Sequence, residues 1–203
     1  MRLDRNAIVT GALALARREG LGAVGVRAVA AELGVTPMAL YRYVDDATAL
    51  EAATVAALLA DLPAVPDGRW EERCRTWAHG TRNALSQAEG LPAHVLRHWV
   101  HLPPVLRALE DLVAMLEADG PVGIDVVAAA NALLMHALMR AQADQEVRSA
   151  GVRRDLTTMR SMREQLPALW AHREEYRIAR LDAHFVYGLD ALLAGIGASG
   201  TAT

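Results

Sequence analysis

Five polar side chains near the start of the chain could contact nucleic acid: Arg27, Thr36, Tyr41, Arg42 and Tyr43. Guanidinium, hydroxyl and phenol groups donate hydrogen bonds to phosphate oxygens and to the edges of bases. Two tyrosines and an arginine on three successive residues of a short surface helix are costly to expose unless they bind a partner. This group therefore predicts a surface that contacts DNA.

A second group, His94, His98 and His101, has the spacing i, i+4, i+7, which places three imidazoles on one helical face beside Trp99. Two imidazoles at this spacing can hold a metal ion between them. No carboxylate or cysteine of the same segment completes a tetrahedral set, so we expect these histidines to be partly exposed or to line a pocket. The sequence accordingly predicts no metal site and no cofactor.

The residues around the first group form the elements of a helix-turn-helix. Asp4 is a good N-cap for a first helix, which ends at Gly20. A second helix is expected at Val26–Leu33 and a third from Pro37 to about Tyr43, with Gly34 in the turn between them. An ordinary corner between two helices has the same spacing, but the exposed polar residues favour the DNA-binding alternative.

The stretch VGVRAVAAELGVTPMALYRYVDDATAL, at 24–50, resembles the DNA-binding segment of the TetR family of transcriptional repressors. Its AxxLGVxxxxLYxYV pattern, which includes both tyrosines, is far more specific than a generic helix-turn-helix. The segment from Phe185 to Gly195 is similar to the final helix of that family. The resemblance implies an all-α fold, with an N-terminal three-helix helix-turn-helix DNA-binding domain at 1–46 and a larger helical ligand-binding and dimerisation domain at 47–197. The small polar residues of 198–203 predict a disordered tail.

The resemblance also implies roles by position. Arg27 matches a residue that can read a guanine, and Tyr41 and Tyr43 match positions that hold phosphates. The positions at which the family reads bases are Thr36, Pro37, Met38 and Ala39.

Two departures from the family pattern affect this assignment. Gly25 stands where a capping Ser or Thr is usual, and Asp-Asp-Ala at 45–47 replaces a stretch that often contains a phosphate-binding lysine. Residues 1–50 hold six arginines against five acidic residues. We therefore expect modest non-specific affinity for DNA, with Arg42 contributing more than its usual share.

The rest of the chain predicts a helical bundle that forms a homodimer. Helices are expected at 47–61, 70–88, 93–101, 104–119, 124–143 and 172–195. A dimer meets two half-sites about 34 Å apart, so two-fold symmetry has to be built into the protein. Small or aliphatic residues on two of these helices are the interface candidates: Ala128, Ala132, Leu181, Phe185, Leu189 and Leu192. The alternative is that both helices are simply core.

A small-molecule inducer, largely apolar, is the other expected partner. Its candidate contacts are residues that a bundle core does not normally choose: Trp77, His98, Trp99, His101, Met115, Met135, His136, Met139 and Trp170. Met135 and Met139 lie one turn apart and form an adaptable lining, or else plain core. The run Val100-His101-Leu102 is similar to the place where tetracycline repressors present a metal-binding histidine, so a tetracycline-like ligand is an alternative.

The amino-acid composition excludes several other classes of protein. Of 203 residues, 53% are hydrophobic and 4% aromatic, which favours packed aliphatic helices over sandwiches and barrels. The net charge of −3 excludes a polycation that coats nucleic acid. Cys74 is the only cysteine, so no internal disulfide is possible and a reducing compartment is expected. Apolar stretches are short or interrupted by polar residues, so we expect a cytoplasmic protein with no membrane partner.

The leading interpretation is a ligand-responsive transcriptional repressor that binds a palindromic operator as a homodimer and is released by an inducer. One alternative is an enzyme with a helical active site, but no Ser–His–Asp arrangement, glycine-rich phosphate loop or paired carboxylates stand out. The other alternative is a helical adaptor that binds protein, which leaves the tyrosine pair unexplained. We therefore expect a regulator and not an enzyme.

Overall fold

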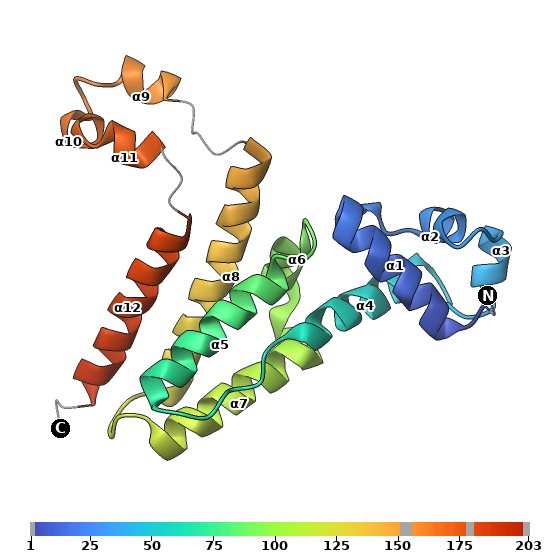
Figure 1. Ribbon diagram of the computed structural model, residues 1–203, viewed down its shortest axis with the longest axis horizontal. Helices are drawn as coiled ribbons and strands as arrows, with labels where there is room; N and C mark the ends of the chain where they lie inside the picture. Colours follow the sequence, from blue (N-terminus) through green and yellow to red (C-terminus); the bar gives the residue numbers. More distant parts are fainter. Residues whose placement is uncertain (1–2, 151–155, 178–180, 201–203) are drawn as a thin grey trace.

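The computed structural model describes residues 3–150, 156–177 and 181–200, which form helices and no strand (Figure 1). This confirms the all-α fold. The helices are α1 (Arg5–Glu19), α2 (Val26–Glu32), α3 (Pro37–Leu40), α4 (Ala47–Leu58), α5 (Trp70–Leu85), α6 (Leu91–His98), α7 (Pro103–Asp119), α8 (Val126–Ala150), α9 (Thr157–Ser161), α10 (Pro167–Ala171), α11 (Arg173–Arg177) and α12 (Leu181–Ser199). Short 3₁₀ turns occupy Leu21–Ala23 (η1), Leu59–Asp61 (η2) and Trp99–His101 (η3).

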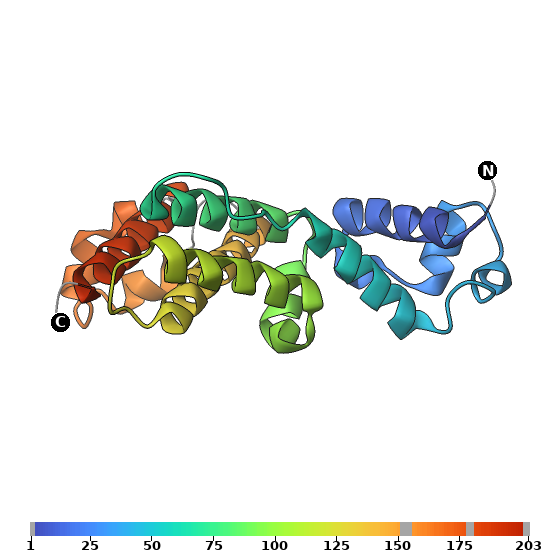
Figure 2. The same cartoon turned by 90° about the horizontal axis from the view of Figure 1, so that it is seen from below.

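Helices α1 to α3 form a head at one end of the molecule, as Figure 2 shows. The side chain of Asp4 accepts a hydrogen bond from the backbone N–H of Ala7 at 2.8 Å, which confirms the expected N-cap of α1. Gly34 turns the chain between α2 and α3 with φ +66°, a conformation that favours glycine. The buried residues of the head, here called the head cluster, are Ile8, Ala12, Leu15, Val26, Val29, Ala30, Leu40, Val44 and Leu50.

Helix α4 joins the head to the bundle and contributes to the core of each. Asp46 caps it by accepting a hydrogen bond from the N–H of Ala49 at 2.7 Å, so an acid that departs from the family pattern has a structural use. Leu50 belongs to the head cluster, whereas Val55 and Leu58 pack in the core of the bundle. Any rotation of α4 therefore moves the head relative to the bundle.

The bundle is arranged around α8, which packs against α5, α6, α7 and α12 (Figure 1). Its core is mostly aliphatic, with Trp77 and Phe185 as its largest fully buried side chains. One ionic group crosses this core. Arg82 of α5 donates from Nε to Asp144 of α8 at 2.7 Å, and Arg140 donates to the other oxygen of Asp144 at 3.0 Å.

Several expectations about helix ends differ from the structure. The helix expected at 70–88 ends at Leu85, and the one expected at 124–143 runs as α8 from Val126 to Ala150. The third helix ends at Leu40 and not near Tyr43, because the chain turns there and brings Val44 into the head cluster. The single helix expected at 172–195 is divided into α11 and α12, and residues 178–180 between them lie outside the described part. Helix α12 also continues through Ser199, two residues into the expected disordered tail, whereas 201–203 lie outside the described residues.

Candidate functional site

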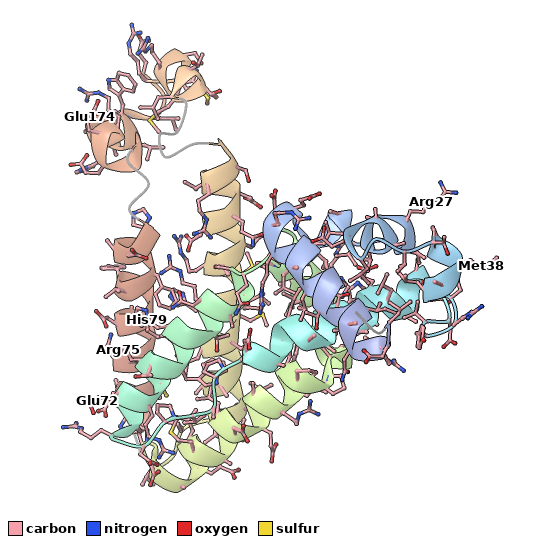
Figure 3. The ribbon with its side chains drawn as sticks, turned by 45° about the vertical axis from the view of Figure 1, so that its right-hand side comes forward. Arg27, Met38, Glu72, Arg75, His79 and Glu174 are labelled. Atoms are coloured by element: carbon pink, nitrogen blue, oxygen red, sulfur yellow. The ribbon has the colours of Figure 1, made fainter. Side chains whose placement is uncertain are left out.

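The segment around α3 has one face buried in the head and one face exposed. Leu40 is fully buried and Val44 is 5% exposed, so both anchor the segment in the head cluster. Met38 and Tyr41, in contrast, are 74% and 52% exposed. Figure 3 shows Arg27 and Met38 projecting outward from the head, away from the bundle. The polar and base-reading candidates thus share the outer end of the head, where the rest of the described protomer leaves them open to a partner.

The remaining candidates lie beside these residues. Thr36 and Pro37 are exposed at the start of α3, and Ala39 is half-buried. Thr36 is at the N-cap position of α3, but its side chain makes no capping hydrogen bond. Its hydroxyl is therefore not used to hold α3, and it is open to an external partner.

The arginines of the head fall into two kinds. Among the described residues, Arg27 and Arg42 have no carboxylate partner, and both are exposed. Arg18, in contrast, donates to both oxygens of Glu32, at 3.0 and 2.7 Å. This pair joins α1 to α2, and its hydrogen bonds hold the pKa of Glu32 below its usual value. Sequence reasoning missed it, because residues fourteen apart show no periodic relationship.

The inducer-contact candidates do not converge on one cavity. Trp77 and Met115 are buried in the bundle core, whereas Met139 is 50% exposed on α8. Trp170 lies on α10, half-buried, with the guanidinium of Arg173 5.1 Å from its ring centroid. Met135 is partly buried against the core, and Trp99 is half-buried in η3.

Phe185 is the centre of a polar and aromatic cluster within the bundle. The ring of His136 stacks on it at 5.0 Å between centroids, and Nε2 of His136 lies 2.9 Å from the carbonyl oxygen of Phe185. The ring of His79 meets Phe185 edge-on at 4.8 Å, and the guanidinium of Arg82 lies 4.7 Å from its centroid. Burial, followed by Arg82 and Arg75, lowers the pKa of His79. His79 and Arg75 lie on the same stretch of α5 (Figure 3).

The histidines of the second group gather at a different place. His94, His98 and His101 line a cleft of about 540 Å³ between α4 and the segment from α6 to the start of α7. Glu51 of α4 also lines it, with Oε1 3.4 Å from Nδ1 of His94. The carboxylate that the histidine segment lacks is thus supplied by a helix much earlier in the chain, which spacing alone does not reveal. Among the described residues, however, no group of three or more His, Cys, Asp or Glu side chains could hold a metal ion.

Some candidates for the dimer interface are buried within the protomer, and others lie at a groove on its surface. Phe185 and Leu189 are completely buried within the protomer, so as interface residues they are better described as core. The side chain of Leu181 lies outside the described residues. Ala128 and Leu192 line an apolar groove between α8 and α12, with Ile124 and Ile196, and Ala132 is half-buried on α8.

Sequence reasoning missed two exposed apolar side chains on these helices. Tyr187 of α12 is 80% exposed and Val127 of α8 is 60% exposed. These side chains, on two helices that pack against each other, are apolar groups available to a partner. None of the described helices is long and apolar enough to cross a membrane.

A helix-turn-helix head with an exposed recognition segment, carried on a helical bundle, defines a DNA-binding transcriptional regulator. Residues 8–46 match the model described as bacterial regulatory proteins, tetR family, and residues 62–199 match the tetracyclin repressor-like C-terminal domain. The chain therefore belongs to the TetR family. Regulators of this family are ligand-responsive and bind operator DNA. No curated protein sequence matches the chain.

Solved structures share the fold over nearly the whole chain. A possible TetR family transcriptional regulator from Streptomyces coelicolor A3(2) is 26% identical, with a TM-score of 0.77 and coverage of 96% of this chain and 99% of that one. Streptomyces coelicolor ActR in complex with (S)-DNPA is 20% identical, with a TM-score of 0.75 and coverage of 98% and 100%. BioQ, a Mycobacterium smegmatis protein, bound to its double-stranded DNA operator is 21% identical, with a TM-score of 0.69 and coverage of 97% and 99%.

Proposed function

We propose that two copies of this chain bind a palindromic operator through the segment from α2 to Tyr43, and that a small molecule bound in the bundle releases them. The observation that supports the proposal is the contrast in side-chain exposure between neighbouring residues of one short segment. Leu40 and Val44 are buried anchors, while Met38, Tyr41 and Tyr43 between and beside them are exposed. BioQ, which has this fold, was solved with its operator.

Each exposed group has a role that fits its chemistry. Thr36, Pro37, Met38 and Ala39 lie at the base edges of the major groove, where the methyl and thioether groups contact thymine methyls. Tyr41 and Tyr43 hold phosphates by their hydroxyl groups, and Arg42 between them neutralises one phosphate. Arg27 reads a guanine at the start of α2. The guanidinium groups of both arginines, which have no carboxylate partner in the described part of the chain, support this assignment.

The dimer forms through α8 and α12. The groove lined by Ala128 and Leu192 and the exposed side chains of Val127 and Tyr187 support this surface. A second copy would cover it by two-fold symmetry, as operator half-sites about one helical turn apart require. Residues 1–46 then act as the DNA-binding domain and 47–197 as the ligand-binding and dimerisation domain.

The inducer binds within the bundle and acts through α4. Trp77 Nε1 and Thr81 Oγ1, one turn apart on α5, are buried without a hydrogen-bond partner among the described residues. Unpaired buried polar atoms are costly, so a largely apolar ligand that offers them a donor and an acceptor gains affinity. ActR was solved with (S)-DNPA, and a variant of TetR from Acinetobacter baumannii AYE was solved with minocycline. Because α4 packs in both cores, a ligand that shifts it changes the spacing of the two heads.

The test is selection of random duplex DNA by the purified protein, followed by measurement of the affinity for the enriched sequence against salt. An enriched palindrome with a steep negative slope of log K against log salt is the expected result. A folded dimer that enriches no sequence at low salt, and that releases no small molecule when denatured, would contradict the proposal. Denaturing that sample and analysing the released small molecules then distinguishes a degenerate head from one that a co-purified inducer has switched off.

A further inference from the structure

The cleft between α4 and α6 lies apart from the part of the bundle core in which the inducer is proposed to bind. Of the described residues, it is lined by side chains of α4 and of the segment from α6 to the start of α7, and not by Trp77 or Thr81. Its volume of about 540 Å³ falls within the range of about 300–1,000 Å³ that is usual for small-molecule sites. A ligand held in this cleft is therefore additional to the inducer.

Much of the cleft lining is apolar. The side chains without polar atoms come from both walls, and they are Ala52, Val55, Ala56, Leu102, Pro103 and Pro104. Val55 is 1% exposed and belongs to the bundle core, so its position at the cleft is fixed by packing. A lining of this kind favours a ligand with an apolar body, because binding removes apolar surface from water.

The two charged side chains of opposite sign in the cleft differ in their partners. Oε1 of Glu51 lies 3.4 Å from Nδ1 of His94, so this carboxylate already has a partner within the protein. Arg97 has no carboxylate partner among the described residues, and its Nε donates to the backbone carbonyl of Ala93 at 3.3 Å. The Arg97 side chain is exposed, and its charge is therefore available to a solute in the cleft.

Two imidazoles accompany the guanidinium of Arg97. His98 and His101 both line the cleft and both are exposed. An imidazole has at least one N–H, whether it is neutral or protonated, and can donate it to an oxygen atom of an anion. Within the described part of the chain, the cleft thus combines an arginine without an acidic partner and two further donors with a carboxylate that His94 already contacts.

We propose that this cleft binds an organic anion with an apolar body, a carboxylate or sulfonate on an aromatic ring system. Arg97 holds the anionic group by charge-assisted hydrogen bonds, and His98 and His101 donate to the same group. The alanines and Val55 of α4 and the prolines of α7 contact the apolar body. Charge complementarity favours an anion over a cation, because the cleft carboxylate is the charge that already has a partner.

A ligand in the cleft contacts α4, the helix that joins the head to the bundle. Leu50 packs in the head cluster, and Glu51 directly after it lines the cleft. A ligand held between α4 and α6 therefore restricts α4 and, with it, the orientation of the head. The resulting change in operator affinity rests on the proposed function. The binding itself does not depend on that function and can be measured without DNA.

The first experiment compares two fluorescent probes that share one aromatic body. 8-Anilinonaphthalene-1-sulfonate is an anion, and N-phenyl-1-naphthylamine lacks the sulfonate and is neutral. We expect the full-length protein to bind the sulfonate, and Arg97→Gln to weaken this binding about five- to tenfold while leaving the neutral probe unaffected. Glu51→Gln should strengthen binding of the sulfonate, because it removes a like charge. Arg107→Gln, an exposed arginine of α7 outside the cleft lining, is the matched control and should bind both probes like the wild type.

Ala56→Phe tests where the sulfonate binds. Ala56 is exposed and lines the cleft, so a phenyl ring there fills the cleft without entering the core, and affinity for the sulfonate should fall. Circular dichroism of each variant checks that the fold is retained. The proposal is overturned if the wild type does not bind the sulfonate, or if Ala56→Phe binds it equally well. An unchanged affinity for the sulfonate in Arg97→Gln, or an equal loss for both probes, also overturns it. Tighter sulfonate binding in Arg97→Gln with weaker binding in Glu51→Gln would identify a cation site instead.

The second experiment measures operator affinity with and without the sulfonate, using an operator that carries a red fluorophore. A change of about fivefold or more in the wild type that is lost in Arg97→Gln supports the regulatory role. Equal affinities in the wild type overturn that role. If no operator can be selected, the proposed function fails while the probe measurements still decide the site.

Discussion

Arg82 of α5 and Asp144 of α8 form an ion pair inside the bundle, with Nε of Arg82 2.7 Å from Oδ2 of Asp144. The side chain of Asp144 is 1% exposed. Its other oxygen accepts from Arg140 at 3.0 Å, and the guanidinium of Arg82 lies 4.7 Å from the ring centroid of Phe185 on α12. Asp144 of α8 and Asp182 of α12, which accepts from Arg82 at 2.8 Å, thus hold the guanidinium that connects α5, α8 and α12.

Asp144→Ala should destabilise the protein strongly, because it leaves the buried guanidinium of Arg82 with only the exposed carboxylate of Asp182, 2.8 Å away, as its partner. Removing one partner of a buried pair costs about 3–5 kcal/mol. Urea denaturation at a fixed protomer concentration measures the free energy of unfolding. The control is Asp190→Ala, which removes the exposed pair with Arg75 and should cost about 1 kcal/mol or less. Equal losses in the free energy of unfolding for the two variants would show that the buried ion pair contributes no more than the exposed one.

Tyr41→Ala and Arg42→Ala should weaken operator binding without unfolding the dimer. Both side chains are exposed, so neither change removes a core contact. Arg42→Ala should also reduce the salt slope by about one, since one phosphate contact is lost. Fluorescence anisotropy with the selected operator at several salt concentrations gives both quantities. Arg107→Ala, an exposed arginine of α7, is the control and should bind like the wild type. If both head variants also do so, the recognition segment has been assigned incorrectly.

Tyr187→Arg should shift the dimer toward monomers and thereby weaken operator binding. The ring is 80% exposed in the protomer, and a charge in its place is poorly tolerated where a second copy covers it. Sedimentation velocity over a range of concentrations measures the dimerisation constant. Leu106→Arg, on an exposed part of α7, is the comparison and should leave the dimer intact. An unchanged dimer in Tyr187→Arg would remove α12 from the proposed interface.

Cys74 should resist alkylation in the folded protein. It is completely buried in α5, and burial raises the pKa of its thiol to about 12. The reactive thiolate is therefore scarce and inaccessible at neutral pH. Iodoacetamide labelling followed by mass spectrometry should be slow in buffer and fast in urea. Rapid labelling under native conditions would show that α5 opens readily.

Local signals in the sequence predict much of the fold. Asp4 and Gly34 mark a cap and a turn that the structure contains, because caps and turns depend on neighbouring residues. The same reasoning cannot find Glu51 beside His94, because only tertiary packing brings α4 against α6. It also assigns Phe185 to a surface, since periodicity identifies an apolar face without indicating whether the protomer or a partner covers it.

The head should lose stability in acid, because the ion pair formed by Arg18 and Glu32 is lost there. The hydrogen bonds from Arg18 lower the pKa of Glu32 from its ordinary value of 4.5. The contribution of the pair to stability is therefore complete above about pH 4.5, where an unfolded Glu32 is also ionised, and is lost as the pH falls through the lower, folded value. Glu32→Gln should remove this part of the acid dependence while changing little else. Thermal unfolding followed by circular dichroism between neutral pH and pH 3 compares the two proteins. The curves should converge in acid, and parallel curves throughout would show that the carboxylate of Glu32 contributes nothing to the junction of α1 and α2.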